Sequence, residues 1–163
     1  MTAAGTGATH AVTITGFEAG AGTDTIDIGA ITVNNGSLAN AGGVGATNTL
    51  AAVPVVAGGN NSTATANGGI YTLNGAGDQM AANSTIANAV ARGVAALQST
   101  TDFSSANVAA GDDLIIVLDD GTNSFIFQYL AAGNAGITEA ADMQLIAKVD
   151  GVQANAFLVG DFI

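Results

Sequence analysis

The 163 residues contain only two basic side chains, Arg92 and Lys148, against thirteen Asp and Glu, and the formal net charge is −11. Because phosphate groups and anionic lipids are bound by clustered Lys and Arg, this balance argues against nucleic-acid and membrane-surface partners. The chain has no Cys, which excludes disulfides, thiolate metal sites and cysteine nucleophiles. Many large secreted bacterial proteins lack disulfides, so we expect an extracellular protein of bacterial origin.

The length fits a single domain over residues 1–163, which we expect to be secreted and β-rich. A chain of this size buries roughly two-thirds of its unfolded surface. The longest strongly apolar run, residues 114–118, is far too short to span a bilayer, so no membrane insertion is expected. Residues 1–10 lack the basic and apolar regions of a classical signal peptide, and we expect any export address elsewhere in the chain.

Two strands are predicted near the N-terminus, at residues 11–15 and 25–33, paired around the Gly-rich turn 16–22. Residues 28–77 then contain no charged side chain and are rich in Gly, Asn, Thr and Ala. This composition predicts long surface loops joining short strands. Alternatively, because uncharged strands leave their edges unprotected, the segment pairs with a neighbouring subunit.

A helix is predicted over residues 83–99, with Asn83 or Ser84 as its N-cap. Glycine in a helix interior costs about 1 kcal/mol relative to alanine, so Gly93 is expected where the helix packs closely on a sheet. The apolar face comprises Ile86, Val90, Gly93, Val94 and Leu97.

A buried central hairpin is predicted from strands 113–118 and 124–130, which are apolar on both faces and are joined by residues 119–123. Residues 143–149 alternate as a strand with a partly wet face, and residues 156–163 are predicted to be another strand. The expected fold is mostly β: a sandwich-like domain in which the helix covers the sheet and the earlier strands complete the second layer or project from it.

Residues 19–27 differ at one specified position from the nonapeptide of calcium-binding β-rolls, in which Asp carboxylates and turn carbonyls coordinate the ion. Asp24 and Asp27 are therefore candidate calcium ligands. The next candidate copy, residues 42–50, has Thr47 at the ligand position. A structural turn before a strand is the alternative.

Two further acidic pairs, Asp112 with Asp113 and Asp119 with Asp120, flank the first hairpin strand. At the rise of an extended strand the pairs lie roughly 20 Å apart, so they cannot form one catalytic dyad. Asp and Gly at such turns serve backbone geometry. A surface calcium site at either pair is the alternative.

Residues 13–17 and 22–28, together with 123–127 and 143–152, resemble the C-terminal regions of repeats-in-toxin and bacterial surface-layer proteins exported by type I secretion. The resemblance implies extracellular location and calcium binding. The terminal Asp161, Phe162 and Ile163 are similar to the uncleaved export signal of some members; the alternative is a strand that ends there. The chain departs from the family in lacking a repeat array.

The expected function is a non-enzymatic structural subunit that assembles with copies of itself into a surface layer, filament or matrix, in contact with cell-surface polysaccharide. The single histidine, His10, lies in a polar stretch, and no serine of the sequence occurs in a Gly-x-Ser-x-Gly motif. Both observations argue against Ser-His-Asp hydrolase chemistry. The alternatives are the export and calcium-folding module of a larger adhesin or hydrolase, and a carbohydrate- or ice-binding module. Thr-x-Thr triplets favour ice binding, but their spacing is irregular.

Overall fold

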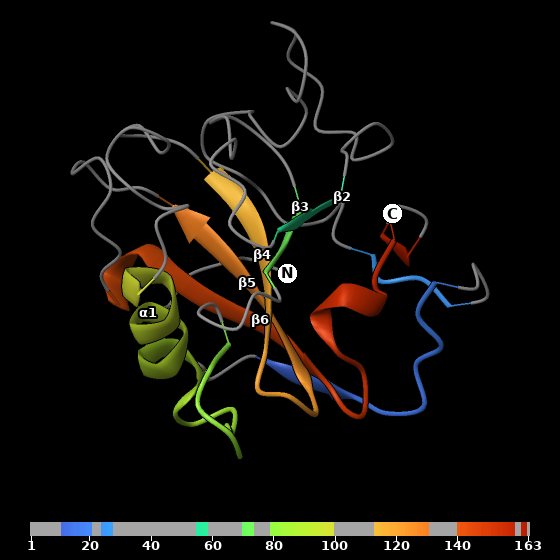
Figure 1. Cartoon of the computed structure of the whole chain (residues 1–163), viewed down its shortest axis with the longest axis horizontal. Helices are drawn as coiled ribbons and strands as arrows, with labels where there is room; N and C mark the ends of the chain where they lie inside the picture. Colours follow the sequence, from blue (N-terminus) through green and yellow to red (C-terminus); the bar gives the residue numbers. More distant parts are fainter. Residues whose placement is uncertain are drawn as a thin grey trace, which may run out of the picture.

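A six-stranded mixed sheet with one helix packed on it forms the described part of the chain (Figure 1). The computed structural model describes residues 11–20, 24–27, 55–58, 70–73, 79–99, 113–130, 140–158 and 161–162. The elements are β1 (Val12–Ile14), β2 (Val55–Gly58), β3 (Ile70–Leu73), α1 (Ala89–Ser99), β4 (Asp113–Asp119), β5 (Ser124–Leu130), the 3₁₀ turn η3 (Ala140–Asp142), β6 (Met143–Val149) and the 3₁₀ turn η4 (Ala154–Ala156). The expectation of a mostly β fold with one packed helix is confirmed.

The strand order is β1-β6-β5-β4-β3-β2. The strands β4, β5 and β6 form an antiparallel meander, while β1 runs parallel to β6, and β2 and β3 run parallel to β4. The predicted pairing of residues 11–15 with 25–33 is wrong in the described part, because β1 pairs with β6 and Ile26 bridges Phe162. The early strands thus extend the sheet at its two edges rather than forming a second layer.

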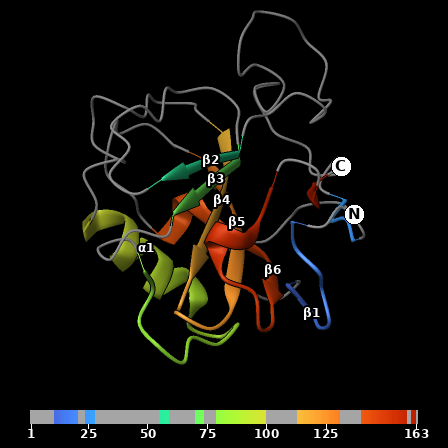
Figure 2. The same cartoon turned by 45° about the vertical axis from the view of Figure 1, so that its right-hand side comes forward.

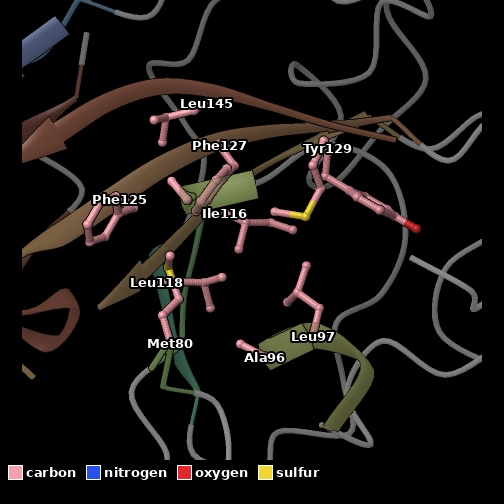
Figure 3. Close-up of a cluster of buried hydrophobic side chains, with 11 residues drawn as sticks. Met80, Ala96, Leu97, Ile116, Leu118, Phe125, Phe127, Tyr129 and Leu145 are labelled. Carbon is pink, nitrogen blue, oxygen red and sulfur yellow. The ribbon is translucent and has the colours of Figure 1, made fainter. Parts of the chain in front are cut away.

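The central hairpin is buried on both faces, as its sequence predicts. Alternate residues of β4 enter different apolar clusters, with Ile116 and Leu118 on the helix side and Ile115 and Val117 on the other. Figure 3 shows the helix-side cluster, in which Met80, Ala96 and Leu97 pack against Ile116, Leu118, Phe125, Phe127, Tyr129 and Leu145.

Strand β6 contains a bulge that its sequence does not reveal. Ile126 pairs with Ala147 and Phe127 with Leu145, so Ile146 is an extra residue between them. Leu145 therefore packs in the helix-side cluster and Ala147 in the opposite one, although two residues normally bring a strand back to the same face. The predicted strand 143–149 is confirmed, but its buried residues divide between both faces of the sheet.

Helix α1 starts at Ala89, six residues later than predicted from position 83. Asn83 has a φ of 61°, in the left-handed region, which prevents a helix from starting there. The first helical backbone bond runs from the Arg92 amide to the Asn88 carbonyl, and Asn88 Oδ1 accepts the Thr85 amide at 2.8 Å. The proposed caps at Asn83 and Ser84 are therefore wrong.

The predicted apolar face of α1 is confirmed, and Gly93 is where the helix approaches the sheet. A Cβ at this position would lie 3.0 Å from Met143 Cε and 3.1 Å from Phe127 Cζ. Val94 and Leu97 pack into the same cluster. The short distance between helix and sheet, rather than backbone conformation, thus favours glycine at this position.

The other face of the sheet is covered by two irregular segments, one near each end of the chain (Figure 2). Phe157 stacks on Phe17 with ring centroids 5.6 Å apart and lies 5.5 Å from Phe162. The predicted strand 156–163 is wrong in its described part: η4 ends at Ala156, and Asp161 Oδ2 accepts the Leu158 amide in a tight turn. The described strands all belong to one sheet, so irregular chain supplies the layer that a second sheet would supply in a sandwich.

Replacing Gly93 with Val should lower the free energy of unfolding by about 2 kcal/mol, because the added methyl groups overpack the contact with Phe127. Helix propensity alone would act in the opposite direction. Ala95→Val at an exposed position of the same helix is the control, with an expected cost of about 0.6 kcal/mol from propensity. Urea denaturation measures both, and a Gly93→Val protein as stable as the parent would contradict the close packing.

Candidate functional site

The turn between β4 and β5 places two consecutive carboxylates, Asp119 and Asp120, inside the protein. Their relative exposures are 1% and 6%. Because successive side chains of a strand point to opposite faces, Asp119 follows Ile115 and Val117 on one face and Asp120 follows Ile116 and Leu118 on the other. The adjacent residues therefore reach different covering layers.

Asp119 connects the turn to the C-terminal layer. Its Oδ1 accepts the Gly121 amide at 2.9 Å, and its Oδ2 accepts the Ala154 amide at 3.1 Å. Gly121 has a φ of 85°, which glycine adopts without strain. Both carboxylate oxygens thus have backbone donors, which compensates the cost of burying the charge.

Asp120 connects the same turn to the segment that leads into α1. Its Oδ2 accepts the Ser84 amide at 2.9 Å, while its Oδ1 accepts the amides of Thr122 at 3.1 Å and Asn123 at 2.8 Å. The Met80 amide also donates to the Asp119 carbonyl at 2.8 Å. The helix side of the sheet is therefore fastened at the same turn.

Arg92, in α1, binds the same segment before the helix from the helix side. Its Nη1 donates to the carbonyls of Ala81 and Ala82 at 3.0 and 2.8 Å, and to Ser84 Oγ at 3.1 Å. Arg92 lies outside the apolar face of α1, and its side chain fixes the loop before the helix. Its described bonds are all within the subunit.

Three more contacts tie the turn to the chain after β6. Ser124 Oγ donates to the Val152 carbonyl at 2.6 Å, Gln153 Nε2 donates to the Gly121 carbonyl at 2.9 Å, and Asn123 Oδ1 accepts the Gly151 amide at 3.1 Å. The composition of residues 119–123 indicates a turn but not these partners. No sequence signal identifies them, because they lie about thirty residues away.

The described candidate calcium ligands, Asp24, Asp27, Asp113, Asp119 and Asp120, are not gathered into one group. Asp113 opens β4 opposite Leu130 and Asp119 closes it opposite Ser124, so these two members of the acidic pairs lie at opposite ends of the strand, as expected. Asp112 lies outside the described residues. Within the described ranges no three His, Cys, Asp or Glu side chains are grouped as metal ligands. Calcium binding stays a prediction.

The candidate β-roll motif forms a turn in its described part. Asp24 Oδ2 accepts the Glu18 amide at 2.9 Å, which closes the loop between them. Asp27 is exposed beside the buried Ile26. Residues 21–23, which would supply carbonyl ligands, lie outside the described part.

Asp161, one of the predicted export residues, joins the two ends of the described chain. This carboxylate is 1% exposed, and it accepts the Gly20 amide at 3.1 Å to Oδ1 and 3.0 Å to Oδ2, together with the Leu158 amide at 2.7 Å. The Ile26 amide donates to the Asp161 carbonyl at 2.7 Å. Phe162 is buried and Ile163 lies outside the described residues, so the described tail is an integral part of the fold.

No known protein family, characterised protein or solved structure matches this chain. The described residues include no helix long and apolar enough to cross a membrane. The chemistry that Asp119, Asp120 and Asp161 perform in the described structure is hydrogen bonding to backbone amides. They fasten one element to another.

Asp119→Asn and Asp120→Asn should each lower the free energy of unfolding by about 2 kcal/mol, because an amide group replaces one acceptor oxygen with a donor facing other donors. Hydrogen exchange should separate them: Asp119→Asn accelerates exchange at the Ala154 amide, and Asp120→Asn at the Ser84 amide. Asp24→Asn, at a solvent-accessible bond, is the control and should cost less than about 1 kcal/mol. Equal protection of both amides in all variants would contradict the two-sided attachment.

Asp161→Asn should release the chain ends without opening the central hairpin. We expect a loss of about 2 kcal/mol in unfolding free energy and faster exchange of the Gly20 and Ile26 amides. Amides of the β4–β5 pair should still exchange only through global unfolding, so their exchange should change only as much as the overall stability does. Unchanged exchange at Gly20 would show that Asp161 does not hold the N-terminal segment.

Proposed function

We propose that this chain is a secreted, non-enzymatic structural subunit that assembles outside the cell into a surface layer, filament or matrix, with calcium bridging carboxylates between subunits. The observation that carries the proposal is the use of the buried carboxylates Asp119, Asp120 and Asp161. Each is occupied by backbone amides and fastens a separate part of the chain. This arrangement favours a rigid building block.

The basic residues give a reason for the dependence on cations. Arg92 binds carbonyls within the subunit, and Lys148 pairs with Asp150 two residues away. The chain has no other Lys or Arg, and its net charge is −11. Copies therefore repel one another, and contacts between them require either uncharged surfaces or divalent cations that bridge carboxylates.

The expected location and self-association rest on the sequence. The composition favours an extracellular protein, and the resemblance of residues 13–17 and 22–28 is to exported surface proteins. The charge-free segment 28–77 is a plausible source of subunit contacts, and strands β2 and β3 lie within it. Cell-surface polysaccharide is the proposed second partner.

Sedimentation of the purified protein with millimolar calcium, and again with excess chelator, tests this function. We expect a pellet of ordered polymers under the electron microscope with calcium, and a soluble subunit with chelator. Sodium chloride at matched ionic strength is the control, because it screens charge without bridging carboxylates. A monomer under every condition would overturn the proposal and favour an export module or a ligand-binding module.

A further inference from the structure

The six-stranded sheet ends in two edge strands of similar length, β1 and β2. Among the described residues each has one strand neighbour, β6 for β1 and β3 for β2. The Ile14 carbonyl accepts the Asp150 amide at 2.9 Å on the β6 side. Because backbone groups of successive strand residues alternate in direction, the N–H and C=O of Thr13 are directed away from β6.

Within the described residues, neither edge strand contains the charges, prolines or bulges that hinder pairing with another chain, although both strands are short. Natural edge strands carry Lys or other charges, prolines or bulges for this purpose. In β1, Val12 is 52% exposed and Thr13 is exposed, and residues 11–17 are uncharged. Strand β2 belongs to the charge-free segment 28–77, and the only proline, Pro54, precedes the strand in sequence.

The charge distribution indicates that the partner is another copy of this chain. Both basic side chains already have partners within the subunit, so opposite charges contribute little to a contact between copies. Copies with a charge of −11 repel each other least where uncharged segments meet. The two edges of the sheet are such segments.

Strand directions determine how the copies can join. Strands β1 and β6 run in the same direction, and β5 runs opposite to them. Strands β4, β3 and β2 again run in the direction of β6. The edge strands β1 and β2 therefore run the same way. Joining β2 of one copy to β1 of the next gives a parallel pair. This contact is heterologous, because it uses a different surface on each copy, so it generates an open polymer unless the rotation between copies closes a ring.

Resting on the structural role proposed above, we infer that copies assemble edge to edge, with β1 of one copy paired in parallel with β2 of the next, so that one sheet continues through the polymer. The contact involves three residues of β1 and four of β2. Each junction is therefore weak, and the polymer depends on many of them and on conditions that reduce charge repulsion.

The absence of cysteine in the chain makes cross-linking a direct test. Thr13→Cys is mixed with Val56→Cys or Ala57→Cys, which are tried separately because successive strand residues face opposite sides. A mass tag on one variant identifies mixed products. After assembly and treatment with a short bis-maleimide, we expect mixed Thr13–Val56 or Thr13–Ala57 dimers and few dimers in either variant alone.

The alternative results separate this inference from the proposed function. Efficient cross-linking of Thr13→Cys to itself would indicate an antiparallel β1–β1 dimer and overturn the head-to-tail arrangement. Polymers that form without mixed cross-links would overturn the edge contact and leave the structural role standing. Failure of the parent protein to assemble in any condition would overturn both.

A second pair of variants tests the edge without cysteine chemistry. Val12→Lys places a charge on β1, whereas Leu158→Lys makes the same change at the other large apolar side chain exposed among the described residues, which is 54% exposed and outside the edge strands. Both alter net charge equally. We expect Val12→Lys to reduce the sedimenting fraction at least tenfold and Leu158→Lys to leave it near the parent value; equal effects would overturn the edge contact.

Discussion

The pair of carboxylates at the β4–β5 turn is the constraint on which the rest of the described structure depends. A sheet buried on both faces needs two covering layers, and each layer must be held at a defined position. Asp119 binds the layer that contains Ala154, and Asp120 binds the segment that leads into the helix through Ser84. Since Asp119 ends β4 and Asp120 follows it directly, both layers are fastened at one point of the chain.

This use of charge suits a chain with few large side chains. Aromatic residues make up only 5% of the sequence, and Ala and Gly are abundant. Small apolar side chains fill space but specify orientation poorly, whereas a buried carboxylate is satisfied only when its donors occupy defined positions. Hydrogen bonds to backbone amides therefore supply the specificity that bulky core residues supply in other folds.

The parts of the fold that follow from local patterns could be predicted from the sequence. The hairpin and the apolar helix face depend on patterns within one short stretch of chain, and the glycine on that helix face indicates close packing on the sheet. The pairing of β1 with β6 could not be predicted, because it joins residues separated by most of the chain. The Ile146 bulge could not be predicted because buried and partly buried residues still alternate along β6. Beyond the bulge the buried residues lie on the other face of the sheet, which is also covered, so the pattern does not change.

The acidic residues illustrate a second limit. Asp and Gly in a turn are equally typical of calcium loops and of side chains that bind their own backbone, and only the positions of the donors distinguish these uses. For Asp119 and Asp120 the described donors are amides, including the distant Ala154 and Ser84. The helix start was misplaced for a related reason, because Asn83 has a cap-forming side chain but a left-handed backbone.

The parallel pairing of β1 with β6 also has a consequence for the order of folding. Gly20 and its partner Asp161 are 141 residues apart, and β1 can pair only after β6, more than a hundred residues later in the sequence, is present. Contacts of such large sequence separation require costly loop closure before they stabilise anything, which slows folding. During synthesis from the N-terminus, β1 stays without this partner until β6 has been made, so this edge of the sheet forms late.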